Sequence, residues 1–366
     1  MTVATAICSS DSTMRGAVTT RFRLPTSGSN RLAVRATAAA AARAPVPGIP
    51  ATLVIGYHTA LRILNDPDHF PADPRGWQKN VPAECPILPM LGWRPNALRN
   101  AGLDHQRYRQ ANTAGIAEEA LNTILGCTPG IGRKVATGMA AIFEGINAAE
   151  GNAMLTEGLL ELVRLERDEP GADLATRLIE DPAALDDEEM IHQLVTLYGA
   201  GIEPQLNLIV NTLLLMMTDD RFADSVHGGT RSTRDALGEV LFTDPPLANY
   251  CVSYPRQPIL IDGVWLPANQ PVVISMAGCN NGPAIGSGEY TDNRSHLAWG
   301  LGPHACPAKS VAYLIVQEAI DQLLDALPEL QLAAAVEDLV WRPGPFHRAL
   351  ASLPVFFPAS PPLPVF

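Results

Sequence analysis

The stretch WGLGPHACPA, residues 299–308, places one cysteine among glycines and prolines, directly before an apolar helical pattern. A helix that starts after a cysteine offers positive potential and free N–H groups, which favour the thiolate. Gly300 and Gly302 let the backbone pass close to a flat ligand, and His304 can donate to an anionic group on it. The loop therefore indicates a metal-bound Cys306, with a buried structural thiol as the alternative.

The composition narrows the classes of function. The chain has 366 residues, 47% of them hydrophobic and 17% charged, which is typical of a globular protein with a large core. Its net charge of −12 argues against nucleic-acid binding, which needs a basic face. The six cysteines form no CxxC pair, so a zinc site is not expected and a reducing cytoplasm is. No apolar run reaches the length of a membrane span.

Residues 1–45 differ from the rest of the chain. They contain six arginines and one acidic residue among many Ala, Ser and Thr. This composition is typical of a targeting segment, and equally of an irregular tail or of an extension before the true start of the protein. We treat residues 1–45 as an irregular segment and residues 46–366 as a single domain.

The periodicity of apolar residues predicts a mainly helical fold with a minor β portion. A proline-rich irregular segment over residues 71–96 precedes the helices of the middle region. Residues 170–187 are expected to be a linker, and residues 188–220 one long buried helix whose acidic start suits the positive end of a helix. Residues 257–280 are expected to form strands with glycine-containing turns. After the cysteine loop, Ala312, Ile315, Ala319, Leu323 and Leu327 share one face of a last helix.

The cysteine loop resembles the FGxGxHxC segment of the cytochrome P450 family, with Trp299 in place of Phe and Ala308 in place of the following Gly. The resemblance implies that Cys306 is the proximal thiolate ligand of haem iron, of the haem b type. It also implies that His304 approaches a haem propionate. Trp299, Gly300, Gly302 and Ala308 would complete the haem loop.

Other segments resemble the same family in the same order along the chain. "DHQRYR" resembles the segment that binds the propionates, which assigns that role to His105 and Arg109. "YGAGIEP" resembles the distal-helix motif AGx[DE]T, with catalytic positions at Ala200, Gly201, Glu203, Pro204 and Gln205. The implied architecture is one cytochrome P450-type domain with a long central distal helix over the haem. Taken singly, each of these segments is also compatible with an ordinary exposed helix face or close helix packing.

Three departures from the family bear on mechanism. The ExxR motif of the family reads Glu239-Val-Leu-Phe242 here, and Phe242 cannot make the charge-assisted bond that Arg makes to the Glu. The distal Thr of the family is Pro204, which has no hydroxyl and lacks the N–H for the Ala200 carbonyl, so the helix is expected to open or kink. Ser253 occupies the strand position where the family often has a propionate-binding Arg. The interval between Arg109 and Ala200 is also shorter than is usual in the family.

The function expected from the resemblance is oxidation of a small, apolar or aromatic secondary metabolite with dioxygen. Hydroxylation and radical coupling of aryl or indole groups both stay open, because the loss of the Thr weakens the inference to hydroxylation. Electrons are expected from a separate ferredoxin and ferredoxin reductase, in a cytoplasmic monomer without nucleic-acid or membrane partners. Met90, Trp93 and Val273 are candidate pocket residues. The alternatives are a haem protein without oxygenase activity and a helical binding protein without a cofactor.

Overall fold

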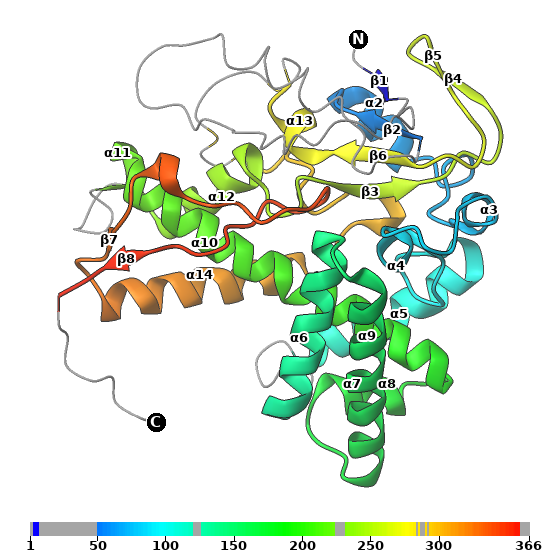
Figure 1. Cartoon of the computed structure of the whole chain (residues 1–366), viewed down its shortest axis with the longest axis horizontal. Helices are drawn as coiled ribbons and strands as arrows, with labels where there is room; N and C mark the ends of the chain where they lie inside the picture. Colours follow the sequence, from blue (N-terminus) through cyan, green and yellow to red (C-terminus); the bar gives the residue numbers. More distant parts are fainter. Residues whose placement is uncertain are drawn as a thin grey trace.

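The computed structural model describes residues 3–6, 50–119, 126–223, 231–282, 285, 290 and 293–358. The protein is a single domain with 52% helix and 10% strand (Figure 1). Of residues 1–45 only strand β1 is described, so the expectation of an irregular segment otherwise lies outside the described residues. Within the described ranges, none of the helices combines the length and the apolar character of a membrane span.

The helices carry most of the chain. Those before the cysteine loop are α2 Tyr57–Leu64, α3 Arg75–Gln78, α4 Leu88–Leu91, α5 Gly102–Glu119, α6 Pro129–Glu144, α7 Ala148–Asp168, α8 Leu174–Glu180, α9 Asp187–Gly201, α10 Glu203–Thr218, α11 Asp220–Ala223, α12 Thr233–Thr243 and α13 Met276–Asn280. The 3-10 turn η2 Gly302–His304 lies in the loop itself, and α14 Lys309–Ala326 and the 3-10 turn η3 Val336–Asp338 follow it.

The strands form one larger and two small sheets. They are β1 Val3–Ala6, β2 Ala51–Val54, β3 Asn249–Ser253, β4 Ile259–Ile261, β5 Val264–Leu266, β6 Val272–Ser275, β7 Gln331–Leu332 and β8 Val355–Phe356. The larger sheet has the order β1-β2-β6-β3, and β2 pairs with β6 in parallel although more than 200 residues separate them. The strands expected over residues 257–280 are confirmed as β4, β5 and β6.

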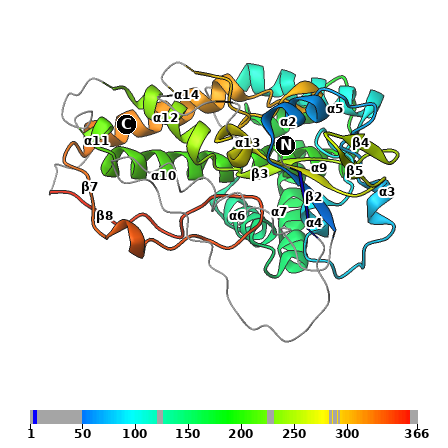
Figure 2. The same ribbon diagram turned by 90° about the horizontal axis from the view of Figure 1, so that it is seen from above.

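The predicted long helix is two helices that meet at Ile202. The acidic start is confirmed, because the Asp186 side chain caps α9 in a capping box with Glu189. The opening expected at Pro204 is also confirmed, since α9 ends at Gly201 and α10 begins at Glu203 with Pro204 in its first turn. The distal helix therefore does not run unbroken over the cavity described below (Figure 2).

Two predictions about helices were wrong. Residues 170–187 are not only a linker, because α8 forms there with Asp173 as its N-cap, whose carboxylate accepts from the Thr176 N–H at 2.9 Å. In α14 the buried face runs through Ala312, Val316 and Ile320, whereas Ala319 is exposed. The buried residues of α14 are spaced four apart, and Ile315, which was expected on the same face, lines the cavity instead.

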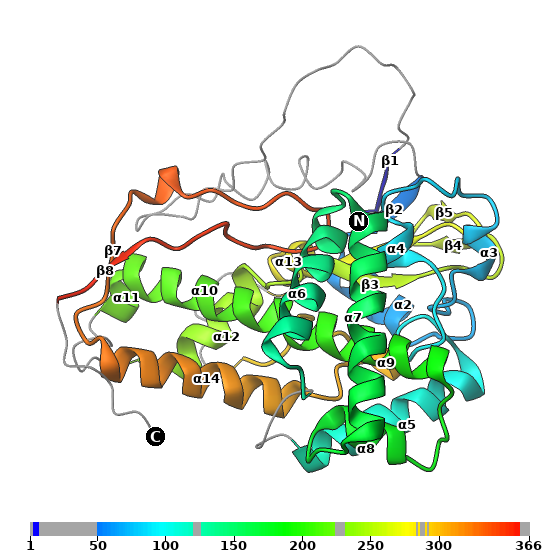
Figure 3. The same cartoon turned by 60° about the horizontal axis from the view of Figure 1, so that its bottom comes forward.

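Helices α6 and α7 form a tight pair that extends away from the sheet (Figure 3). Gly138 and Gly151 let the two backbones approach, since a Cβ on Gly138 would lie 2.4 Å from the Gly151 carbonyl oxygen. Leu155, Leu159 and Leu162 of α7 are completely buried in the core that α6, α7, α8 and α9 share. Helix α9 is packed against α7 in this core.

Helix α12 is fixed by aromatic contacts where the family has an ion pair between Glu and Arg. Phe242 is completely buried, stacks on Tyr290 at 4.2 Å between ring centroids and contacts His296 edge-on at 5.1 Å. Glu239 is also buried, and its carboxylate accepts from Arg221 of α11 at 3.2 Å. The motif Glu therefore keeps a cationic partner, but from another helix.

This packing predicts that restoring the family's arginine destabilises the protein. Phe242→Arg places a charge among two rings while Glu239 is already paired, so we expect it to lower the free energy of unfolding by about 3 kcal/mol or more. Phe242→Leu keeps the position apolar and should cost about half as much. Denaturant unfolding measures both variants, and an Arg variant as stable as the parent would contradict the aromatic assignment.

Candidate functional site

The cysteine loop is held in shape by its own backbone. The Cys306 N–H donates to the Trp299 carbonyl at 2.8 Å, and the Ala305 N–H donates to the Gly302 carbonyl at 3.0 Å. Gly302 has a φ of +70°, and a Cβ on it would lie 2.1 Å from the carbonyl oxygen of Leu64 in α2. A glycine is therefore required at Gly302, which explains one of the two glycines from which the loop was identified.

Cys306 lies just before the N-terminus of α14, with Ala308 as the helix N-cap. Burial raises the pKa of the thiol, and the Ala308 backbone N–H and the charges of Arg109 and Lys309 act in the opposite direction. The N–H groups and cations surrounding the sulfur are those that stabilise a thiolate once a metal ion takes the proton's place.

Histidine and arginine side chains form a polar wall next to the cysteine. The rings of His105 from α5 and His304 from the loop lie 4.1 Å apart, and the buried Nε2 atom of His105 has no hydrogen-bond partner among the described residues. Burial lowers the pKa of His304 to about 3, and the neighbouring His105, Arg109 and Arg99 act in the same direction. The predicted residues His105, Arg109 and His304 are thus brought together, in surroundings that favour an anion.

Arg99 completes this wall and was missed by the sequence analysis. It is only 3% exposed, and its Nη2 donates to the Met90 carbonyl and to the Tyr250 hydroxyl, both at 2.8 Å. The hydroxyl oxygen of Ser253, at the strand position where the family often has an arginine, is buried and has no hydrogen-bond partner in the part of the chain that the structure describes. The sequence shows only an arginine six residues before His105, and its burial and its contact with Tyr250 are visible only in the structure.

The distal helix and the cysteine loop face one cavity of about 310 Å³. Of the predicted distal residues, Ala200, Gly201, Pro204 and Gln205 line it, as do Trp299, Gly300, Cys306 and Ala308 from the loop. Met90 lines the cavity as expected, whereas Trp93 and Val273 are not among the lining residues. The indole N–H of Trp299 is buried, and none of the residues in the described ranges accepts a hydrogen bond from it.

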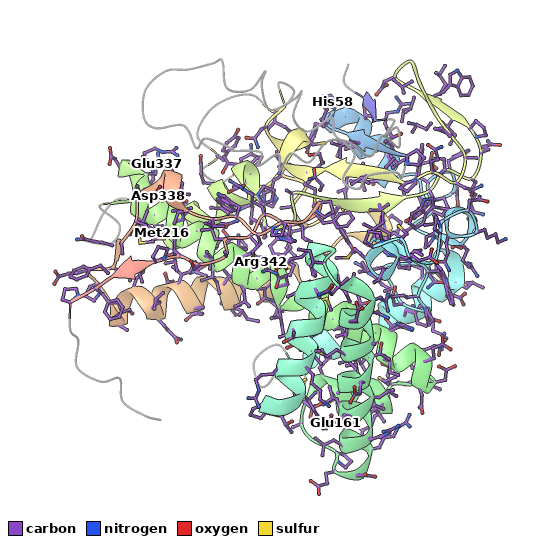
Figure 4. All side chains as sticks on the ribbon, in the orientation of Figure 1. His58, Glu161, Met216, Glu337, Asp338 and Arg342 are labelled. Carbon is purple, nitrogen blue, oxygen red and sulfur yellow. The ribbon has the colours of Figure 1, made fainter. Side chains whose placement is uncertain are left out.

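Glu203 lies outside the cavity lining. Its carboxylate accepts from Arg342 at 2.5 Å and from the Asn207 amide at 3.3 Å. The same arginine donates to Glu144 at the end of α6, at 2.8 Å. Figure 4 shows Arg342 where the C-terminal segment crosses between α6 and α10. Both acids are thus bound to one arginine from a segment that the sequence analysis did not connect to the site.

The comparisons with known proteins agree on one family. Cytochrome P450 107B1 of Saccharopolyspora erythraea is 30% identical over 215 residues, which cover 57% of this chain and 53% of that protein. The 2-hydroxy-5-methyl-1-naphthoate 7-hydroxylase of Streptomyces carzinostaticus is 28% identical over 57% of this chain and 53% of its own length. The chain thus spans about half the length of the curated relatives it matches, and no family profile matches it.

The solved structures extend the likeness over most of the chain. CYP154C4 from Streptomyces sp. W2061 superposes with a TM-score of 0.74 and 20% identity, covering 88% of this chain and 94% of that one. At this identity the likeness establishes the fold. Sequence likeness and fold both support a bacterial cytochrome P450, from whose motifs this chain departs at Phe242 and Pro204.

Proposed function

We propose that the protein is a haem-thiolate oxidoreductase that oxidises a small, apolar or aromatic secondary metabolite with dioxygen and external electrons. One observation carries the proposal: the Cys306 loop and the α9–α10 break face the same cavity, beside a wall of arginine and histidine side chains. The relatives' names support the substrate class, since one is a naphthoate hydroxylase. Oxygen insertion and aromatic coupling both remain within the proposal.

The residues present fit a haem. The Cys306 sulfur would ligate the iron, and Arg99, Arg109, His105 and His304 would bind the two propionates; Nε2 of His105, which has no partner among the described residues, would donate to one of them when it carries the ring proton. Haem, when bound, supplies an iron centre that activates dioxygen. Gly300 has a φ of +66°, and its lack of a side chain would let the loop backbone approach the face of the ligand.

The side chains at the start of α10 determine how a proton would reach the cavity. Pro204 has no hydroxyl, and Glu203 is bound to Arg342 away from the cavity. Gln205 is the polar side chain of the α10 first turn that lines the cavity, so it would hold water there. A proton would reach that water from Glu203 only when the Glu203 carboxylate leaves Arg342.

The electron donor would dock on the outer side of the cysteine loop. Lys309 is exposed there, and Arg294 lines a second hollow of about 270 Å³ together with Cys306. A cationic surface in a chain of net charge −12 suits an acidic partner, which a ferredoxin would be. The ferredoxin and its reductase are therefore proposed as partners.

The thiolate ligand is tested by Cys306→Ala. The parent protein should show a strong Soret band and, when reduced with carbon monoxide, the shifted band of thiolate-bound haem; the variant should lose the shifted band completely. Cys251→Ala is the matched control, because this thiol lines the same cavity but burial raises its pKa to about 12. Survival of the thiolate spectrum in Cys306→Ala would refute the assignment.

The propionate role of Arg99 is tested by Arg99→Gln. Loss of a charge-assisted bond should speed the transfer of haem to apomyoglobin by about tenfold. Iron protoporphyrin dimethyl ester has no carboxylates, so parent and variant should release it at the same rate. If both release rates change equally, Arg99 has a structural role only.

The role of Pro204 is tested with 1-naphthol, ferredoxin, ferredoxin reductase and NADPH. Pro204→Thr and Pro204→Ala both restore an N–H for the Ala200 carbonyl, but only Thr adds a hydroxyl. We expect Thr to raise the share of product that gains one oxygen several-fold over the parent, and Ala to leave it unchanged. Mass spectrometry separates this product from a dimer that has lost two hydrogens; equal effects of Thr and Ala would contradict the expectation.

A further inference from the structure

The wall of the cavity contains a second arginine from the loop before α5. Arg94 lines the cavity, and its guanidinium contacts three elements. Nη2 donates to the Pro89 carbonyl of α4 at 2.7 Å and to the Asn152 side chain of α7 at 2.6 Å, and Nη1 lies 3.3 Å from Nδ1 of His192 in α9. These contacts fix the position of the charge.

Every one of these contacts is made to a neutral group. Burial and the charge of Arg94 lower the pKa of His192 to about 4, so the imidazole is uncharged at neutral pH. Burial and the nearby Arg99 lower the pKa of Arg94 to about 10, which leaves the guanidinium charged. Over the described part of the chain, no Asp or Glu forms an ion pair with Arg94. A partly buried cation with only neutral partners is costly unless an anion joins it.

The cavity lining as a whole also has more positive than negative side chains among its described residues. Its described lining includes Arg94, Arg99 and Arg109 and no acidic residue, although the chain has a net charge of −12. A haem would bring two carboxylates to the side of His105 and His304, whose rings lie 4.1 Å apart near Arg99 and Arg109 of the cavity lining. The two propionates would balance the charges of Arg99 and Arg109, so the charge of Arg94 would remain unbalanced.

The position of Arg94 suits the far end of a substrate. His192 lies eight residues before Ala200 on α9, which is about 12 Å along a helix. The surface between them is mostly apolar and includes Val195 and Leu197 of α9 with Met139, Ile142 and Phe143 of α6. Three of the five N–H donors of the guanidinium are assigned to protein groups, which leaves donors for a ligand.

We propose that Arg94 binds the carboxylate of the substrate, which makes the substrate an apolar acid oriented with its other end toward the α9–α10 break. This inference rests on the proposed function, because it concerns the same cavity. The competing explanation is that Arg94 only ties α4, α7 and α9 together. That role needs no anion and predicts no preference between an acid and its amide.

Calorimetry on the purified haem-loaded protein separates these explanations with two pairs of probes: decanoic acid and decanamide, and 1-naphthoic acid and 1-naphthamide. In the parent, at least one acid should bind tenfold or more tightly than its amide. Arg94→Gln should remove this preference while the affinity for the amide stays the same. Because the ratio is taken within each variant, a general loss of stability does not imitate the result.

Arg94→Lys is the matched control, since it keeps the charge but not the three fixed hydrogen bonds. It should retain part of the preference for the acid, whereas a purely structural arginine would make Lys and Gln equivalent. A parent that binds neither acid more tightly than its amide, or an Arg94→Gln variant that keeps the preference, overturns the inference. Failure of the proposed function is seen separately, as a parent without the thiolate spectrum.

Discussion

The geometry of the site depends on one buried amide. Asn280, at the end of α13, is completely buried; its Nδ2 donates to the Leu241 carbonyl at 3.0 Å, and its Oδ1 accepts from the Leu297 N–H at 2.8 Å. Leu297 in turn accepts from the Gly300 N–H at 2.8 Å. The first turn of the cysteine loop is thereby connected to α12, and a thiol that must meet a rigid ligand requires such a fixed loop.

The connection through Asn280 explains how the protein can have Phe242 in place of the arginine of the ExxR motif. Arg at position 242 would have to satisfy a buried charge, whereas Phe242 packs on Tyr290 and His296 without one. Glu239 keeps a cation, Arg221, from α11. The backbone links through Asn280 do not use the side chain at position 242, so the connection from α12 to the loop persists without the arginine. Loss of the motif residue therefore need not mean loss of the cofactor site.

The parts of the site that the sequence predicted are those defined by local spacing. The loop around Cys306, the i, i+4 pair His105 and Arg109, and the opening at Pro204 each depend on a few neighbouring residues. Arg99, Arg342 and the Phe242 stack were not predicted because their partners are remote: Arg99 contacts Tyr250, and Arg342 contacts Glu144 and Glu203. The face of α14 was misplaced because a helix that is apolar on several sides gives no unique buried face.

The charged side chains around the cavity would affect the binding of cofactor and substrate as well as the supply of protons. Arg94, Arg99 and Arg109 line the cavity, while Glu203 and Glu144 are bound to Arg342 outside the lining. An ionised Glu203 in the cavity would compete with an anionic ligand for the same arginines. Binding Glu203 to Arg342 leaves the described lining without a carboxylate, which would favour an anionic ligand, but it also holds the carboxylate at the start of α10 outside the cavity lining. On the proposed function, the cavity would favour recognition of an acid over rapid proton supply, and Pro204, which has no hydroxyl, would act in the same direction.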